Sequence, residues 1–153
     1  MLTFRPARVA DLSELEALQS RASFATGENV DDLFAHPDAM TIPVEHLAYA
    51  LVAEINGEIV GFCILLPTSS DAAEVDALFI DPKAWRTGLG RALLLRAEQD
   101  LTNQTRTLRV VSGKRAVPFY QALGFQRAGT EMTRFGPAAR LVKMLSPAGS
   151  PPI

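Results

Sequence analysis

The chain has 153 residues, of which 48% are hydrophobic and 21% are charged, and its formal net charge is −2. This composition suits one globular domain with one core, and the small negative charge gives no general attraction to nucleic acid or to an anionic membrane. The single cysteine, Cys63, excludes an intramolecular disulfide and indicates a reducing compartment. The apolar runs are much shorter than the roughly 20 residues of a membrane span, and the N-terminus lacks a secretion signal. We therefore expect a cytoplasmic protein that binds neither nucleic acid nor membrane.

The first third of the chain predicts a short strand, a helix and a long loop. The strand covers residues 2–5 and ends at Pro6. Asp11 is expected to begin the helix and to accept hydrogen bonds from its free amides, with Glu14 placed as in a capping box. Residues 25–41 show no sustained period, apart from one expected helical turn near residues 30–35. Helical spacing gives the first helix one apolar face, formed by Leu12, Leu15, Leu18 and Ala22.

The middle of the chain changes to a β pattern. Residues 48–55 and 58–66 are predicted strands joined by Asn56-Gly57, which favours a type I′ hairpin turn. A further strand is expected over residues 73–80, where alternation separates two faces. One face carries Val75, Ala77 and Phe79, and the other carries Glu74, Asp76, Leu78 and Ile80.

The remaining elements complete an alternating order. The predicted elements are a helix over 91–101, a strand over 107–111, a helix over 115–123 capped by Gly124, and strands over 125–135 and 139–145. This order predicts an α/β or α+β domain built around a mixed sheet. We expect a single domain over residues 1–146 and a flexible C-terminal tail over residues 147–153.

The most informative segment is residues 78–95, where a strand runs through a glycine-containing turn into a helix. The first amides of a helix have no partner inside the helix, and the helix dipole favours negative charge there. Gly88 and Gly90 lack a Cβ atom, so an anion can approach the backbone. The segment therefore fits a pyrophosphate cradle, and the alternative is a tight turn that needs glycine only for its dihedral angles.

Two other nucleotide-binding motifs fit this segment less well. A Rossmann motif requires a third glycine, and Leu93 stands at that position. A P-loop requires Lys followed by Ser or Thr after the second glycine, where this chain has Arg91 and Ala92.

Two segments resemble motifs of the GCN5-related N-acetyltransferase (GNAT) family. Asp81-Pro82 and the Trp-Arg-Thr-Gly-Leu-Gly-Arg-Ala-Leu of residues 85–93 look like motif A, with Trp85 in place of the usual Gln or Arg. The Phe-Tyr-Gln-Ala-Leu-Gly-Phe of residues 119–125 looks like motif B at its expected distance. The resemblance covers nearly the whole chain. It implies a mostly antiparallel sheet whose fourth and fifth strands splay apart.

The resemblance also implies a binding site for acetyl-CoA as co-substrate. The pantetheine arm is expected to pair with the backbone of Leu78, Phe79 and Ile80. The phosphates are expected to meet the backbone from Arg86 to Arg91, that is Arg86, Thr87, Gly88, Leu89, Gly90 and Arg91. The side chains of Arg86 and Arg91 would add positive charge, and their alternative is a solvated surface position.

The reaction implied by the resemblance is acetylation of an amine by direct attack in a ternary complex. An alkylammonium has a pKa of about 10.4, so a base must take its proton, directly or through water. Glu74 is the first candidate base, with Asp76 as its neighbour or substitute. Tyr120 is the candidate acid for the departing CoA sulfur. The alternatives are ordinary exposed carboxylates for Glu74 and Asp76 and a half-buried helix aromatic for Tyr120.

The acceptor is expected to be an amine on a small molecule, a peptide or a protein. Glu28, Asp31 and Asp32 lie where the resemblance implies the acceptor side, and a solvated loop is their alternative. His36 and His46 lack metal-ligand company, so no metal is expected. A homodimer is possible. The rival function is a module that binds acyl-CoA as a sensor or interaction partner without turnover.

Overall fold

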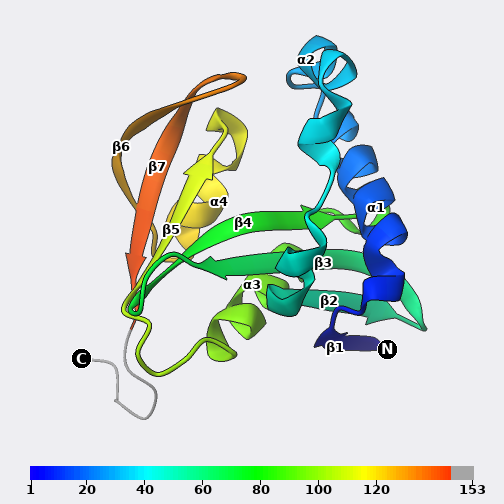
Figure 1. Ribbon diagram of the computed structural model, residues 1–153, viewed down its shortest axis with the longest axis horizontal. Coiled ribbons are helices and arrows are strands. Elements are labelled where there is room, and N and C mark those ends of the chain that lie inside the picture. Colours follow the sequence, from blue (N-terminus) through cyan, green and yellow to red (C-terminus); the bar gives the residue numbers. More distant parts are fainter. Residues whose placement is uncertain (146–153) are drawn as a thin grey trace. The chain divides into compact units, whose positions relative to one another are not determined.

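The structure is a computed structural model that describes residues 1–145 (Figure 1). The predicted tail over residues 147–153 lies outside the described residues. The strands are β1 (Leu2–Pro6), β2 (Ala50–Ile55), β3 (Glu58–Pro67), β4 (Ala72–Ile80), β5 (Thr107–Ser112), β6 (Gln126–Thr133) and β7 (Gly136–Met144). The α-helices are α1 (Leu12–Ala25), α2 (Val30–Ala35), α3 (Leu89–Gln99) and α4 (Val117–Ala122). Short 3-10 helices are η1 (Val9–Asp11), η2 (Pro37–Met40), η3 (Val44–Tyr49), η4 (Pro82–Ala84) and η5 (Lys114–Ala116).

The strands form one seven-stranded sheet in the order β1-β2-β3-β4-β5-β7-β6. The sheet is mostly antiparallel, and β4 and β5 are parallel to each other. Their register joins residues 72–74 of β4 to residues 107–109 of β5. This mixed sheet with flanking helices confirms the predicted fold class.

The chain divides into two compact units. The first joins residues 1–64 to residues 77–99, and the second joins residues 65–76 to the segment that begins at Asp100. Strand β4 contributes to both units, because the division falls between Asp76 and Ala77.

The core of the first unit comes from α1, α3 and the first strands. The largest fully buried side chains of this unit are Phe62, Leu15, Leu18, Ile64, Leu93, Leu94, Val52 and Cys63. Leu15, Leu18 and Ala22 are buried, which confirms most of the predicted apolar face of α1.

Asn56 and Gly57 have φ values of 52° and 82°, as a type I′ hairpin requires. Strand β2 begins at Ala50 rather than residue 48, because η3 continues to Tyr49 and two apolar residues do not set a period.

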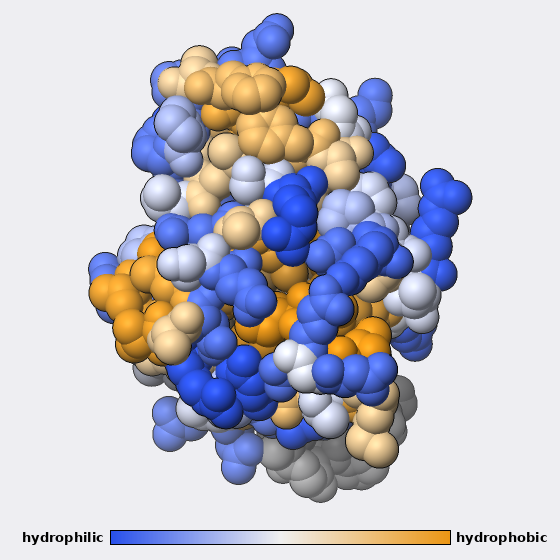
Figure 2. Space-filling model, turned by 90° about the vertical axis from the view of Figure 1, so that its right-hand side faces the viewer, coloured by the Kyte–Doolittle hydropathy of each residue, from blue (hydrophilic) through white to orange (hydrophobic). Residues whose placement is uncertain are grey.

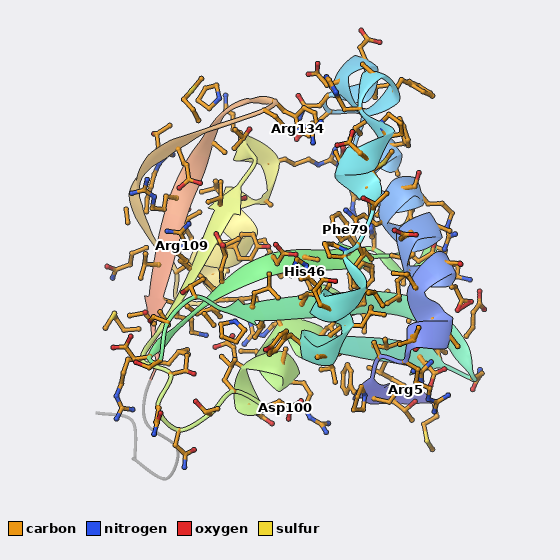
Figure 3. All side chains as sticks on the ribbon, in the orientation of Figure 1. Arg5, His46, Phe79, Asp100, Arg109 and Arg134 are labelled. Carbon is orange, nitrogen blue, oxygen red and sulfur yellow. The ribbon has the colours of Figure 1, made fainter. Side chains whose placement is uncertain are left out.

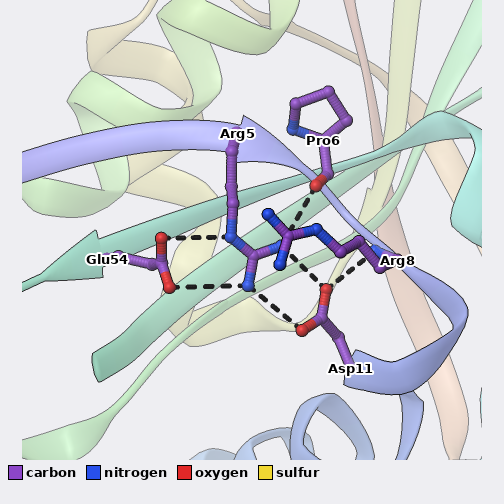
Figure 4. Close-up of polar contacts among 5 residues, drawn as sticks. All are labelled: Arg5, Pro6, Arg8, Asp11 and Glu54. Atoms are coloured by element: carbon purple, nitrogen blue, oxygen red, sulfur yellow. Dashed lines mark hydrogen bonds and ion pairs between the residues drawn. The ribbon is translucent and has the colours of Figure 1, made fainter. Parts of the chain in front are cut away.

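Asp11 does not cap α1 as predicted. Its carboxylate binds the guanidinium of Arg5 through Nη1–Oδ2 and Nη2–Oδ1 contacts of 2.8 and 3.1 Å, and it accepts the backbone amide of Arg8 (Figure 4). Nε of the same guanidinium donates a hydrogen bond to Oε1 of Glu54 on β2 at 3.0 Å. Bidentate charge-assisted hydrogen bonds are stronger than a bond to one helix amide, which explains the difference. The cluster fastens β1 to β2 and to the start of α1.

The second unit packs α4 with β5, β6 and β7. Leu108 and Leu141 are fully buried, and Tyr120 of α4 and Phe125 just after it are also buried. Helix α4 begins at Val117 instead of residue 115, because η5 takes up the first turn. It ends with a Phe125 amide to Tyr120 carbonyl bond and a Gly124 amide to Gln121 carbonyl bond. These two bonds form a Schellman motif, as the glycine at position 124 predicts.

Among residues 1–145, no helix is both long and apolar enough to cross a membrane. Within the same range, no three His, Cys, Asp or Glu side chains are grouped as metal ligands. The expected absence of a metal stays a prediction.

Candidate functional site

The candidate cradle is the connection from β4 to α3, between Ile80 and Leu89. Helix α3 starts two residues earlier than predicted, so Gly90 lies in its first turn. Arg86 and Gly88 have left-handed φ values of 64° and 83°. Left-handed residues in a turn aim successive backbone amides to one side, which makes an anion-binding concavity. Apart from its chain neighbours, a Cβ atom at Gly88 would meet no protein atom within 4 Å, so the space beside this glycine is open.

Short hydrogen bonds brace the turn. The indole Nε1 of Trp85 donates to the carbonyl oxygen of Ile80 at 2.8 Å. The hydroxyl of Thr87 donates to the carbonyl oxygen of Ala84 at 2.6 Å. Trp85 stands where the family motif has Gln or Arg, and here its side chain fastens the turn to the end of β4. This contact also occupies the carbonyl of Ile80, one of the backbone groups expected to meet the pantetheine arm.

The C-terminal half of β4 is closely packed against β3 and α3. The Phe79 and Phe62 ring centroids are 5.7 Å apart, and Figure 3 labels Phe79 on this strand. A Cβ built at Gly61 of β3 would come within 3.1 Å of the Phe79 carbonyl oxygen and 3.4 Å of Leu93. The missing side chain of Gly61 therefore allows β4 and α3 to lie close to β3 at the base of the cradle.

The candidate base Glu74 is paired with an arginine. Its Oε1 accepts a hydrogen bond from Nε of Arg109 on β5 at 3.2 Å (Figure 3 labels Arg109). Arg109 also lies 3.8 Å from Glu131 of β6, which lies 3.4 Å from Arg140 of β7. The Glu74 side chain keeps 25% exposure, and Asp76 is exposed two residues further along the strand. The sequence did not indicate Arg109, because its pairing depends on the register of β5 with β4.

The candidate acid Tyr120 is 7% exposed on α4. Its ring makes edge contacts with Phe119 and Phe125, with centroid separations of 5.1 and 5.3 Å. This packing fixes the ring and so restricts the direction of its hydroxyl.

The predicted residues fall in different units. Leu78, Phe79, Ile80 and residues 86–91 belong to the first unit, whereas Glu74, Asp76 and Tyr120 belong to the second. Within the first unit, the cradle residues follow the strand residues directly along the chain. Within the second unit, Glu74 is joined to Arg109.

Strand β4 leads through a glycine turn to the N-terminus of α3, and β5 then runs parallel to β4 in the mixed sheet. This arrangement is that of an α/β acyltransferase fold. Residues 17–144 match the family model described as acetyltransferase (GNAT) domain. The chain belongs to this family, as its two motifs predicted.

Known proteins are similar to this chain at low sequence identity. PaiA N-acetyltransferase from Thermoplasma acidophilum, solved in complex with coenzyme A, superposes with a TM-score of 0.77 at 17% identity, over 95% of this chain and 99% of that chain. The ribosomal-protein-S18-alanine N-acetyltransferase from Escherichia coli has a TM-score of 0.72 at 24% identity, over 100% and 99%. A UPF0039 protein from Schizosaccharomyces pombe is 24% identical over 102 residues, which are 64% of this chain and 67% of that protein.

Proposed function

We propose that this protein transfers an acetyl group from acetyl-CoA to a primary amine by direct attack in a ternary complex. The observation that carries the proposal is the open turn after β4, where left-handed Arg86 and Gly88 lead into the first turn of α3. Such a turn presents unpaired amides to an anion, and a pyrophosphate is the anion that acyl-CoA carries.

The residues present fit this co-substrate. The backbone from Arg86 to Arg91 would hold the phosphates, and the exposed side chains of Arg86 and Arg91 would add positive charge. The backbone of Leu78 and Phe79 would hold the pantetheine arm, together with those groups of Ile80 that Trp85 leaves open. When bound, acetyl-CoA supplies the activated acetyl group as a thioester.

Glu74 and Tyr120 are the side chains proposed for the proton transfers. Glu74 would take the proton of the acceptor ammonium, with Asp76 or a water chain as the substitute. The ion pair with Arg109 orients the Glu74 carboxylate through one oxygen. Tyr120 would give its hydroxyl proton to the departing sulfur, and its packing between Phe119 and Phe125 supports a fixed direction for that donation.

The acceptor class is an amine of a small molecule, a peptide or a protein. The name of the relative from Escherichia coli says that it acts on an alanine of a ribosomal protein, whereas the other names given above specify no acceptor. In this chain α2 carries Asp31 and Asp32 beside Phe34, which is 72% exposed. Figure 2 shows apolar side chains over α2 at the top of the molecule. We also infer a cytoplasmic location from the single free cysteine, Cys63. A measurement of the oligomeric state would test for a homodimer.

The rival function is an acyl-CoA-binding sensor without turnover. A thiol-detection assay with acetyl-CoA and a panel of amines separates the two. An enzyme releases free CoA only when an amine is present, and the rate depends on which amine it is. Binding of CoA by calorimetry without thiol release across the panel would favour the sensor, and absence of binding would contradict both functions.

A further inference from the structure

Asp81 is the first residue after β4, and its hydrogen bonds fasten the start of the candidate cradle. Its backbone amide donates to the carbonyl of Val60 at 2.8 Å. Its Oδ1 accepts the amide of Lys83 at 3.2 Å, which caps η4. Its Oδ2 accepts Nη2 of Arg21 at 2.9 Å. Both carboxylate oxygens are therefore used within the fold.

Arg21 brings a second element to this turn. It lies on α1, 60 residues earlier in the sequence, so the ion pair connects α1 to the connection that becomes the cradle. Burial alone would raise the pKa of Asp81, but the Lys83 amide and the Arg21 guanidinium hold it below its ordinary value. The carboxylate is consequently charged at neutral pH and keeps both of its partners.

The turn beyond Asp81 needs such support. Arg86 holds a left-handed φ of 64°, which is unfavourable for a residue with a side chain. Strained residues persist where the surrounding structure over-determines them. Between Asp81 and Arg86 the chain is bound at Lys83 and at Trp85, and Arg21 supplies the contact from α1.

We propose that Arg21 and Asp81 form a positioning pair that holds the phosphate cradle in its binding conformation. We expect the pair to act mainly on the conformation of the turn and less on the free energy of unfolding. The side chain of Arg21 is 50% exposed and that of Asp81 is 11% exposed, so solvent screens the Arg21 end of the pair and reduces its contribution to folding. Loss of the Arg21 side chain should therefore loosen the turn more than it lowers the stability of the protein. The identity of the ligand rests on the proposed function, whereas the contact between Arg21 and Asp81 is part of the structure.

A purely electrostatic role of Asp81 predicts the opposite change in CoA affinity for Asp81→Asn. If Asp81 acted only through its charge, Asp81→Asn would remove a negative charge near the bound phosphates and strengthen CoA binding. A positioning role predicts weaker binding, although the asparagine oxygen can still accept the Lys83 amide. The two explanations agree on Arg21→Gln, which weakens binding in both.

The test measures CoA affinity by calorimetry for the wild type, Arg21→Gln, Asp81→Asn and the double variant. We expect each single variant to bind CoA about tenfold more weakly and the double variant to be no weaker than either, because the residues act as one unit. Arg127→Ala removes an exposed arginine on β6 and serves as the charge-matched control for Arg21→Gln, with no expected change. Tighter binding by Asp81→Asn, unchanged binding in both single variants, or additive losses would overturn the proposal.

A second measurement needs no ligand. Hydrogen exchange followed by mass spectrometry should show faster exchange over residues 82–90 in both single variants, with the melting temperature of Arg21→Gln close to that of the wild type. Equal exchange rates in this segment would overturn the positioning role even if Asp81→Asn failed to fold, because Arg21→Gln removes only a half-exposed side chain. A wild type that does not bind CoA contradicts the proposed function, and the exchange measurement still decides whether the pair orders the turn.

Discussion

The indole nitrogen of Trp85 donates a 2.8 Å hydrogen bond to the carbonyl oxygen of Ile80, the last residue of β4. The bond closes the connection that leads from the strand to the cradle. It also gives the chain a built-in probe, because Trp85 is the only tryptophan. We expect its fluorescence to change when CoA binds to the neighbouring backbone.

Trp85→Phe keeps an aromatic ring but removes the indole N–H donor and part of the ring system. We expect the free energy of unfolding to fall by about 1 kcal/mol, because the Ile80 carbonyl loses its partner. CoA affinity should fall with it, since the turn is less firmly held. Urea unfolding followed by circular dichroism measures the first quantity and calorimetry the second. Stability and affinity equal to those of the wild type would show that the hydrogen bond fixes nothing.

Gly90→Val tests the cradle. Gly90 lies in the first turn of α3, where a branched side chain would occupy the space that the proposed site gives to a phosphate oxygen. We expect CoA binding to be lost while the melting temperature stays near that of the wild type. Gly90→Ala is the graded control and should bind with intermediate affinity. Unchanged affinity in folded Gly90→Val would exclude this turn as the phosphate site.

Glu74→Gln tests the base. If Glu74 takes the amine proton, kcat/KM should fall about a hundredfold at neutral pH, and the loss should shrink at high pH where more free amine exists. Arg109→Gln is the matched control, because it breaks the same ion pair and leaves the carboxylate in place. Equal losses in the two variants would mean that Glu74 acts only through the ion pair. Asp76 or a water chain would then inherit the role.

Tyr120→Phe separates a catalytic hydroxyl from a structural one. The ring and its contacts with Phe119 and Phe125 are kept. We expect an unchanged melting temperature, a nearly unchanged KM for acetyl-CoA, and a kcat lower by roughly ten- to a thousandfold, because proton donation develops in the transition state. A variant that loses about 1 kcal/mol of stability and keeps its kcat would assign the hydroxyl to packing.

The Arg5–Asp11 pair predicts how stability depends on pH. The hydrogen bond from Arg5 is the main cause that lowers the pKa of Asp11 below its ordinary 3.8. A carboxyl whose pKa is lower in the folded state stabilises the protein above its unfolded pKa, and that contribution is lost as the pH falls through the folded pKa. Asp11→Asn should therefore cost about 2 kcal/mol near neutral pH and progressively less below about pH 4.

Urea unfolding of both proteins across this pH range checks the prediction. Glu45→Gln removes an exposed carboxylate from η3 and is the control, with no expected change in stability at any of these pH values. A difference between wild type and Asp11→Asn that stays constant from neutral pH to pH 3 would contradict the assignment of the effect to the Asp11 charge.

The sequence by itself determined most of the helices and strands, the mixed sheet and the family, and it predicted where the cradle lies. These features depend on signals spread over a few neighbouring residues: alternation in β4, helical spacing in α1, the Asn56-Gly57 turn, and Gly88 before a helix. The tertiary structure alone decided which partner each charged side chain takes. Asp11 binds Arg5 and not α1, Glu74 binds Arg109, and Asp81 binds Arg21. The physical reason is that these pairs form between different elements, so they depend on strand register and on how a helix packs against a strand end, which no local pattern encodes.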